Sequence, residues 1–509
     1  MPVIADRRDM STTVFINAVK LTKYAYLELP GGGTAFQSII DTSIKLPDVN
    51  KIVVIADNDF SQKGDFRLVR ISGSYMNDLI KIFKDEIGDS ENIFYLYGDT
   101  PLINRDLSIR MYKNHIKYFA SYTFADGYPY GMAPEILKNT VLDQLGTLSE
   151  KNPIKIDRHS VFELIQKDIN SFDIETEISK IDQRMLRVLL AADTKRNYNQ
   201  LKRIMENLET DKVITEESIV NLLETKQDLL RLEPAFVNVQ ICGACTQSCS
   251  YCPYPKVAGD VINLKDEMSL DQWGIILSKV KAFSDDAVFS ISMWGEPSLH
   301  SNILGIINAL LNYENFTLII ETSGIGWNRK VLETLSEIAD GRIDWILSLD
   351  AQNPESYRKL RGDGWEEANS TALLLKKLFP ENLYIQSVRM KDQEEYLEKF
   401  YRSWKDLEFN VIIQKHDNFC GFLPDLRVTD LSPVNRFPCW HLKRDLNILI
   451  DGRVPLCRED LKADYLQGNI FTDELPEIWE KSKSKYLDHL DKKYPEICRG
   501  CDEYYTYNF

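Results

Sequence analysis

The chain has 509 residues, 44% hydrophobic and 27% charged, which is enough for about three globular domains whose cores need no disulfides. Its formal net charge of −16, from 77 acidic and 61 basic side chains, argues against a broad nucleic-acid-binding surface. The first fifteen residues lack the apolar core of a signal peptide, and no apolar run approaches the ~18 residues of a membrane span. We therefore expect a cytoplasmic protein with no nucleic-acid and no membrane partner.

Strand-like and helical patterns alternate through residues 12–150. Helical spacing is found at residues 35–46 and 75–87, between strand-like runs. The strand-like runs are residues 13–19, 51–57 and 92–99. This alternation predicts an open α/β sheet.

Residues 151–232 have a different pattern, with few glycines or prolines. Apolar residues recur at helical spacing over residues 162–172, 177–193 and 216–232. The sequence therefore predicts a helical connector over residues 151–232.

Strand-like and helical patterns alternate again, at regular intervals, between residues 233 and 418. Six strand-like runs, each followed by a helical pattern, lie at residues 236–242, 287–295, 316–324, 344–351, 383–390 and 410–417. Six βα units predict a curved parallel sheet that stays open, because a closed barrel of this kind needs eight. In such sheets the chemistry gathers at the carboxyl ends of the strands.

Four of the nine cysteines lie within eleven residues, directly after the first of these strands: Cys242, Cys245, Cys249 and Cys252. They could be small buried residues, two C-x2-C halves of a zinc site, or ligands of an iron–sulfur cluster. Only three residues separate the two pairs, whereas zinc modules of this kind place about a dozen or more between them. From Cys245 the spacing is C-x3-C-x2-C. Three thiolates on a four-iron cube leave one iron open, as catalytic sites do.

This spacing, with the aromatic Tyr251 before the last cysteine, resembles the signature of the radical S-adenosylmethionine (radical SAM) superfamily. The resemblance implies that Cys245, Cys249 and Cys252 hold a [4Fe-4S] cluster whose fourth iron binds S-adenosylmethionine. It implies reductive cleavage to a 5′-deoxyadenosyl radical, which abstracts hydrogen from a substrate. It also implies a partial (β/α)6 barrel and a reducing partner such as flavodoxin or ferredoxin. Cys242 is then expected to be a small buried strand residue.

The same resemblance implies polar contacts to the cofactor from the other strand ends. "WGEP" resembles the motif that receives the methionine ammonium, and "ETSG" resembles a ribose-contacting segment. The implied cofactor-binding residues are Tyr251, Gly295, Glu296, Thr322, Ser348, Arg361 and Gln386. Two alternatives stay open: Thr322 belongs to an ordinary glycine-terminated turn, and Arg361 is a surface cation.

The other five cysteines lie after residue 419. Residues 446–456 read as a β-hairpin with Asp451-Gly452 at its turn, which would bring Cys439 and Cys457 together. A C-x2-C pair, Cys498 and Cys501, follows. The residues alone leave zinc and a closed iron–sulfur cluster equally open.

C-x12-G-x4-C followed by C-x2-C resembles the SPASM, or shortened "twitch", extension of radical SAM enzymes over residues 419–509. It implies one auxiliary [4Fe-4S] cluster on Cys439, Cys457, Cys498 and Cys501, with Cys420 as an alternative or extra ligand. Some relatives place an aspartate base directly after the cysteine that matches Cys457. Here that residue is Arg458, which leaves the base unassigned.

"GDTPLI" at residues 98–103 resembles the metal-binding strand end of nucleotidyltransferases, with Asp99 as the implied ligand. The glycine-rich basic loop of those enzymes is missing after the first strand. We therefore predict a nucleotide-diphospho-sugar-transferase-like (GT-A-like) α/β domain over residues 12–150 that has lost its chemistry. Over nearly its full length the chain resembles the spirochaete "spiroSPASM" radical SAM proteins.

The predicted fold class is thus α/β: an N-terminal transferase-like domain, a partial (β/α)6 barrel and a cysteine-rich SPASM/twitch extension. The leading hypothesis is an enzyme that abstracts hydrogen from a peptide or carbohydrate-like substrate, assisted by the auxiliary cluster. One alternative is a metal- or cluster-bearing binding protein that does not cleave S-adenosylmethionine. Another is nucleotide-sugar transfer by the N-terminal domain.

Overall fold

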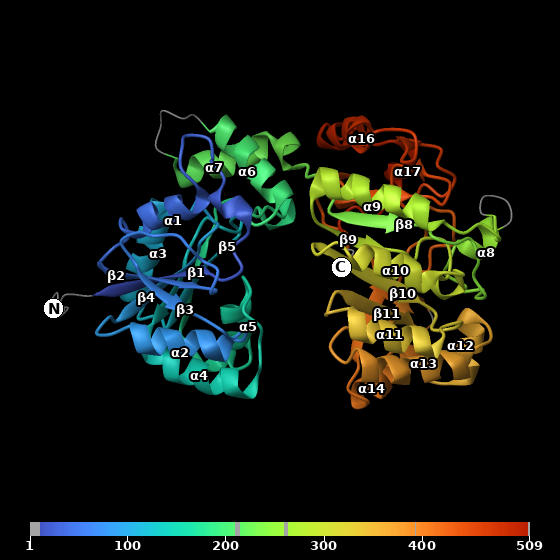
Figure 1. Cartoon of the computed structure of the whole chain (residues 1–509), viewed down its shortest axis with the longest axis horizontal. Coiled ribbons are helices and arrows are strands. Elements are labelled where there is room, and N and C mark those ends of the chain that lie inside the picture. Colours follow the sequence, from blue (N-terminus) through green and yellow to red (C-terminus); the bar gives the residue numbers. More distant parts are fainter. Residues whose placement is uncertain (1–10, 209–213, 259–262, 392, 507–509) are drawn as a thin grey trace. The chain divides into compact units, whose positions relative to one another are not determined.

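The computed structural model describes residues 11–208, 214–258, 263–391 and 393–506. It divides into two compact units, Met1–Leu230 and Arg231–Phe509 (Figure 1). Most of the stretch considered for a signal peptide lies outside the described residues. Within those residues, no helix has the length and apolar character needed to cross a bilayer. The domain boundaries at residues 150 and 418 stay predictions.

The first unit is built on a seven-stranded mixed sheet in the order β3-β2-β1-β4-β6-β5-β7. Its strands are β1 (Thr12–Ala18), β2 (Val49–Ala56), β3 (Arg67–Arg70), β4 (Asn92–Tyr97), β5 (Tyr122–Asp126), β6 (Glu135–Lys138) and β7 (Ile174–Ile178). Strands β1 to β4 run parallel to one another, whereas β6 is antiparallel to β4 and β5. The three strands predicted here are confirmed as β1, β2 and β4.

Helices cover both faces of this sheet, and each face has its own core. Alternate residues of β1 point to opposite faces. Val14 and Ile16 pack with α1, α3, α6 and α7, whereas Phe15 packs with α2, α4 and α5. The helices are α1 (Ala35–Ser43), α2 (Met76–Glu86), α3 (Arg105–Lys117), α4 (Leu142–Lys151), α5 (Ser160–Gln166), α6 (Lys195–Asn207) and α7 (Glu216–Thr225).

The helical prediction for residues 177–193 is wrong. Strand β7 covers the start of this segment and pairs in parallel with β5, and only a 3-10 turn at Arg184–Leu186 follows. The apolar spacing there serves packing rather than a helix, because Leu186, Val188 and Leu190 are buried in the first unit's core. The helical predictions on either side are confirmed in their first parts, by α5 and α7, and a 3-10 turn follows each helix.

The second unit contains the six predicted parallel strands in chain order. They are β8 (Phe236–Val239), β9 (Ala287–Ser290), β10 (Phe316–Thr322), β11 (Ile343–Ser348), β12 (Leu383–Arg389) and β13 (Asn410–Lys415). A seventh strand, β14 (Asp445–Ile448), pairs in parallel with β8 and gives the order β13-β12-β11-β10-β9-β8-β14. The described ladder ends at β13 on one side and at β14 on the other, so the sheet is open.

Helices between the strands cover one face of this sheet (Figure 1). Trp273 of α9 and Trp345 of β11 are fully buried in the core that they form. The described helices of the second unit as a whole are α8 (Tyr254–Val257), α9 (Leu270–Ser284), α10 (Ile303–Leu311), α11 (Arg329–Ile338), α12 (Pro354–Arg361), α13 (Trp365–Leu378), α14 (Glu394–Asp406), α15 (Trp440–Arg444), α16 (Leu475–Leu490) and α17 (Glu496–Arg499).

The predicted hairpin at residues 446–456 forms its turn but not its ladder. The Leu449 N–H donates to the Arg453 carbonyl at 2.9 Å, and Gly452 has φ +84°. The two arms then pair elsewhere. β14 pairs with β8, and β15 (Arg453–Val454) pairs with β16 (Gly468–Asn469). The prediction of a hairpin ladder is wrong because β14 pairs with the edge of β8, a partner about 200 residues earlier in the chain that the local sequence pattern cannot indicate.

Replacing Gly452 with alanine should destabilise the second unit by about 1–3 kcal/mol, because a side chain at positive φ is strained. Its Cβ would also lie 2.4 Å from Asn469 Oδ1 and from the Phe471 ring. The matched control is Gly274→Ala in α9, where no atom lies within 4 Å. That change should stabilise the helix by about 0.5–1 kcal/mol. Denaturation midpoints followed by circular dichroism measure both, and equal shifts would contradict this account of the turn.

Candidate functional site

The inward-facing side chains of the six barrel strands form two layers. The lower layer is an apolar cluster of Phe236, Val288, Ile319, Ile346, Tyr384 and Ile412. Two residues further along each strand, on the same face, is a polar residue. These are Asn238, Ser290, Glu321, Ser348, Gln386 and Gln414. The mouth of the barrel is therefore polar and its floor apolar.

A cavity of about 210 Å³ opens at this mouth. The strands contribute Asn238, Ser290, Glu321 and Gln414 to its wall. The loops beyond the strand ends contribute Cys245, Tyr251, Cys252, Trp294, Gly295, Asp417, Phe419 and Arg458. The cavity thus lies at the carboxyl ends of the parallel strands, where the sequence predicted the chemistry.

The cysteine loop after β8 is held against the end of α12 by backbone hydrogen bonds. The Ser248 N–H donates to the Arg361 carbonyl at 3.1 Å, and the Ser250 N–H donates to the Leu360 carbonyl at 3.0 Å. The hydroxyl of Tyr254 donates to the Gly243 carbonyl at 2.7 Å. These contacts fix the conformation of the segment that carries the three predicted cluster ligands.

The structure separates the four cysteines into three and one. Cys245 and Cys252 line the cavity, and Cys249 is buried close enough to both to affect their electrostatics. Burial raises the pKa of the Cys245 thiol to about 11 and that of the Cys252 thiol to about 12. Cys242 is 2% exposed, and its thiol donates to the Glu296 carbonyl at 3.1 Å. This matches its expected place as a small buried residue.

Gly295 and Glu296 join the ends of β8, β9 and β10. A Cβ on Gly295 would lie 2.2 Å from the Cys242 carbonyl oxygen, so only glycine fits there. The Glu296 carboxylate accepts hydrogen bonds from the Thr322 hydroxyl at 2.5 Å and from the Ser323 N–H and hydroxyl at 2.8 and 2.7 Å. Gly295 lines the cavity, whereas Glu296 and Thr322 do not.

Tyr251, Asp350 and Arg361 form a buried cluster beside Cys249. Asp350 Oδ2 accepts from Arg361 Nη1 at 2.8 Å and from the Tyr251 hydroxyl, and Oδ1 accepts from the Val388 N–H at 2.7 Å. Arg361 is 5% exposed, so the surface-cation alternative is wrong. Burial raises the pKa of the Cys249 thiol, and the Arg361 guanidinium opposes that shift.

Ser348 and Gln386 lie together with a residue that sequence reasoning missed, Glu321. Gln386 Nε2 donates to Glu321 Oε1 at 2.8 Å, and the Ser348 hydroxyl donates to the same oxygen at 3.4 Å. Glu321 is exposed and lines the cavity. The sequence feature that could have predicted Glu321 as a site residue is its charge at an inward-facing position near the end of an otherwise apolar strand.

The late cysteines also gather in one region. Cys439 precedes α15, Cys457 follows β15, and Cys498 and Cys501 lie in and after α17. Burial raises the pKa of Cys439, Cys457 and Cys498, and the neighbouring thiols raise the pKa of Cys457 further: Cys498, Cys501 and Cys439 all lie close enough to act on it. Cys420 joins them: its thiol donates to Cys501, which raises the pKa of Cys420 and lowers that of Cys501.

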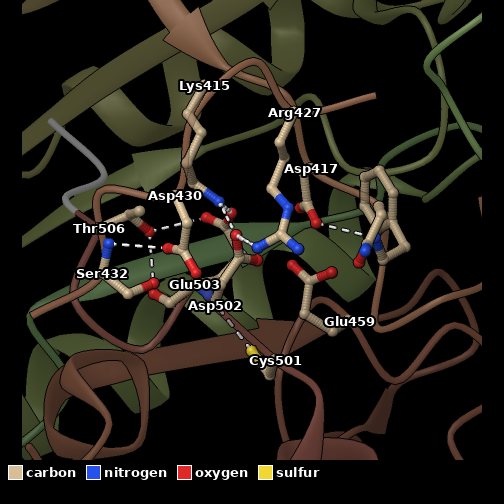
Figure 2. Close-up of polar contacts among 12 residues, drawn as sticks. Lys415, Asp417, Arg427, Asp430, Ser432, Glu459, Cys501, Asp502, Glu503 and Thr506 are labelled. Atoms are coloured by element: carbon tan, nitrogen blue, oxygen red, sulfur yellow. Dashed lines mark hydrogen bonds and ion pairs between the residues drawn. The ribbon is translucent and has the colours of Figure 1, made fainter. Parts of the chain in front are cut away.

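A network of paired charges links the cavity wall to Cys501, and Figure 2 shows Lys415, Asp417, Glu459, Asp502, Glu503 and Cys501 of this network. Arg458, which lines the cavity, donates from Nη2 to Asp417 Oδ2 and from Nε to Glu459 Oε1, both at 2.9 Å. Lys415 pairs with Asp502 at 2.9 Å and with Glu503. The Glu503 N–H in turn donates to Cys501 Sγ at 3.4 Å. Hydrogen bonds and ion pairs thus run continuously from the cavity wall to the cysteine group.

In the first unit, Asp99 is held by an arginine. Arg158 Nη1 donates to Asp99 Oδ1 at 3.0 Å and Nη2 to Oδ2 at 2.5 Å, and Nη2 also approaches Asp193 Oδ2 at 3.3 Å. Burial raises the pKa of Asp99, and Arg158 opposes the shift. Both oxygens that would bind a metal are therefore engaged by a guanidinium. In the part of the chain that the structure describes, no three His, Cys, Asp or Glu side chains converge on a point where they could hold a metal ion.

Comparison with known proteins identifies two regions of the second unit. The family described as "Radical SAM superfamily" matches residues 239–403, and the SPASM "Iron-sulfur cluster-binding domain" matches residues 439–502. An uncharacterised protein of Treponema pallidum (strain Nichols) is 36% identical over 362 residues, which cover 69% of this chain and 98% of that protein.

Two solved structures are also similar to parts of the chain. Streptococcus suis SuiB bound to the precursor peptide SuiA is 13% identical, covers 67% of this chain and 78% of its own, and has a TM-score of 0.43. A cytidylyltransferase from Leptospira borgpetersenii is 17% identical, covers 43% of this chain and 97% of its own, and has a TM-score of 0.37.

Replacing Asp350 with alanine should destabilise the second unit by about 3–5 kcal/mol, because it leaves the buried Arg361 without its anion. The matched control is Asp363→Ala, which breaks the Arg358–Asp363 pair, whose side chains are 78% and 84% exposed. That pair contributes only about 0–1 kcal/mol. Denaturant unfolding midpoints compare the two variants, and similar losses would show that the Asp350 cluster is not structural.

Proposed function

Because the chain belongs to the radical SAM superfamily and carries a SPASM iron–sulfur domain, we propose that its barrel mouth is a hydrogen-abstracting active site. The enzyme's cofactors are [4Fe-4S] clusters and S-adenosylmethionine. We assign one cluster to Cys245, Cys249 and Cys252, and one auxiliary cluster to Cys439, Cys457, Cys498 and Cys501. The proposed substrate is a peptide or a carbohydrate-like molecule.

The observation that carries this proposal is the division of the four close cysteines. Cys245 and Cys252 line the cavity and Cys249 lies close to both, whereas the thiol of the fourth, Cys242, donates to the Glu296 carbonyl. Three thiolates leave one iron of a cubane without a protein ligand, as a catalytic site requires. Thiolates on a cubane bind different irons, so they need not converge on one point as ligands of a single ion do. The residues therefore fit the group.

When bound together, the cluster and S-adenosylmethionine supply a one-electron reductive cleavage that generates a hydrogen-abstracting radical. The residues around the cavity orient these groups. Glu321 presents an exposed carboxylate, fixed by Gln386 and Ser348, that suits the methionine ammonium. Gly295 allows close approach of the backbone. Glu296 and Thr322 bond to each other, so we assign them to positioning the strand ends rather than to contact with the cofactor.

The buried cluster of Tyr251, Asp350 and Arg361 has a supporting role in this proposal. Arg361 places a fixed positive charge near Cys249, which favours the thiolate that a cluster needs. Its backbone carbonyl also anchors the cysteine loop. The side chain is held in place by Asp350, so Arg361 acts on the cluster loop from a rigid position.

The loop after β13 supplies a carboxylate in place of the one that is missing after Cys457. Arg458 takes that place in the chain but holds Asp417, which comes from the end of β13 and lines the cavity. Burial raises the pKa of Asp417, and Arg458 opposes the shift. We propose that Asp417 would accept a proton from the substrate as it is oxidised, and that an auxiliary cluster held by Cys439, Cys457, Cys498 and Cys501 would supply the electron acceptor.

The rest of the proposal concerns location and partners. A cytoplasmic location suits nine free cysteines, because a reducing compartment keeps them available for clusters. The electron for cleavage would come from a flavodoxin or ferredoxin. For residues 12–150 we keep the GT-A-like resemblance as a proposal about fold alone, because Arg158 engages both oxygens of Asp99.

Replacing Cys249 with alanine should remove the first cluster and abolish cleavage of S-adenosylmethionine. Anaerobic reconstitution should give about eight irons in the native chain and about four in Cys249→Ala, at four irons per cluster. The native chain should form 5′-deoxyadenosine with dithionite, and the variant should form none. Cys242→Ala is the matched control and should behave as the native chain. Undiminished 5′-deoxyadenosine from Cys249→Ala would sink the assignment.

Replacing Cys457 with alanine should remove only the auxiliary cluster, so about four irons and 5′-deoxyadenosine formation should both remain. Cys420→Ala should keep about eight irons, because four other cysteines complete the auxiliary cluster. Iron analysis and electron paramagnetic resonance of the reduced proteins distinguish the two variants. If Cys420→Ala loses the auxiliary signal, Cys420 is a ligand and the assigned set is wrong.

A further inference from the structure

The first unit contains a second cavity, of about 240 Å³, that the proposed function does not use. It lies where β4 and β5 end and β6 begins, beside α5. Residues on its wall include Ile103, Ala125, Ala133 and Pro134, which give it an apolar part. The whole cavity belongs to one compact unit and to the part of the chain that the structure describes.

Seven further residues of the wall are aromatic: Tyr95, Tyr97, Tyr122, Phe124, Tyr128, Tyr130 and Phe162. Ring contacts join Tyr95, Tyr97 and Tyr130 into one group and Tyr122, Phe124 and Phe162 into another. The Phe124 ring centroid lies 5.0 Å from that of Phe162 and 5.6 Å from that of Tyr122.

The tyrosine hydroxyls are largely engaged within the protein. Tyr97 donates to the Asp157 carbonyl at 3.0 Å, and Tyr130 donates to the Arg158 carbonyl at 2.9 Å. Tyr128 donates to Glu216 at 2.7 Å. The wall therefore offers a ligand the faces and edges of these rings more than their hydroxyls.

One carboxylate in this wall has an unused oxygen. Glu135 Oε1 accepts from the Tyr122 hydroxyl at 2.5 Å, whereas Oε2 accepts no hydrogen bond among the described residues. Burial raises the pKa of Glu135 to about 7. Arg158, which lines the same wall, pairs instead with Asp99 and Asp193, and its guanidinium lies 5.3 and 5.9 Å from the Tyr97 and Tyr130 ring centroids. A buried carboxylate without a cation is costly, and a ligand that brings a cation would remove that cost.

We propose that this cavity binds a small organic ammonium ligand that has at least one N–H. The N–H would donate to the Glu135 carboxylate, the positive charge would lie against the group of Tyr122, Phe124 and Phe162, and an aliphatic body would contact the alanine and proline side chains. Ring faces attract ammonium groups electrostatically, and the attraction is stronger where water is excluded. A neutral sugar could use the same rings and donate hydroxyls, but it would leave the carboxylate without a counter-charge.

The test is ligand titration of the full-length chain, with n-butylammonium as probe and 1-butanol as its neutral counterpart, by calorimetry and saturation-transfer NMR. n-Butylammonium should bind with a dissociation constant in the millimolar range or below, and 1-butanol should show none. Glu135→Gln keeps an acceptor for Tyr122 but removes the charge, and should weaken binding by about tenfold or more. The matched control, Glu150→Gln on the exposed side of α4, should leave binding unchanged.

A second variant tests the same cavity without changing Glu135, so the proposal can still be tested if Glu135→Gln misfolds. Ala133→Leu narrows the cavity and leaves the carboxylate in place, and it should also abolish binding; circular dichroism checks that both variants fold. Nα-acetyl-lysine N-methylamide is a further probe that distinguishes two kinds of ligand. If it binds, the site accepts a lysine side chain of a peptide; if it does not bind, the site accepts only a free amine. The proposal is overturned if no amine binds, if 1-butanol or glucose binds as tightly as n-butylammonium, or if Glu135→Gln binds like the native chain.

Discussion

The site in the second unit depends on one close approach of backbone to backbone. Gly295 lies so near the Cys242 carbonyl that no side chain fits between them, and the next residue, Glu296, ties the turn after β9 to the end of β10. Three consecutive strand ends are thereby held in a fixed relation. The cysteine loop begins at the first of these ends and docks at its far side on α12. The position of every thiol in that loop therefore follows from contacts that involve no metal.

Buried arginine–carboxylate pairs occur in both units, with different consequences. In the second unit Arg361 is bound to Asp350 but remains close to a thiol, so its charge still acts on the site. In the first unit Arg158 lies between two aspartates at the strand end where a transferase would place a metal. A guanidinium cannot accept ligands or exchange water as a metal ion does, so this pair is structural. The same pair of groups supports the proposed active site in one unit and engages the aspartate predicted to bind a metal in the other.

Local pattern predicted what is locally determined. Runs of apolar residues marked β1, β2, β4 and the six barrel strands, and the spacing of Cys245, Cys249 and Cys252 marked the loop. The sequence did not predict the pairing of strands that depend on a distant partner. Strand β7 is short and only partly buried, and it forms by pairing with β5. Strand β14 pairs with the edge of β8 instead of with the other arm of the predicted hairpin. The site followed the same rule. Glu321 was not predicted because its hydrogen-bond partners, Gln386 and Ser348, lie on two other strands. The ion pair of Asp99 was not predicted because Arg158 lies 59 residues further along the chain.

The pairing of β14 with β8 has a mechanical consequence for electron transfer. Cys439 lies before this strand and Cys457 beyond it, so both flanks of the auxiliary region are covalently attached to a strand of the barrel sheet itself. A region attached in this way cannot swing on a hinge relative to the barrel mouth. Tunnelling rates fall steeply with separation, so a fixed span between the two proposed clusters would make the rate of electron exchange between them a constant of the fold. Domain motion would then have no part in timing that exchange.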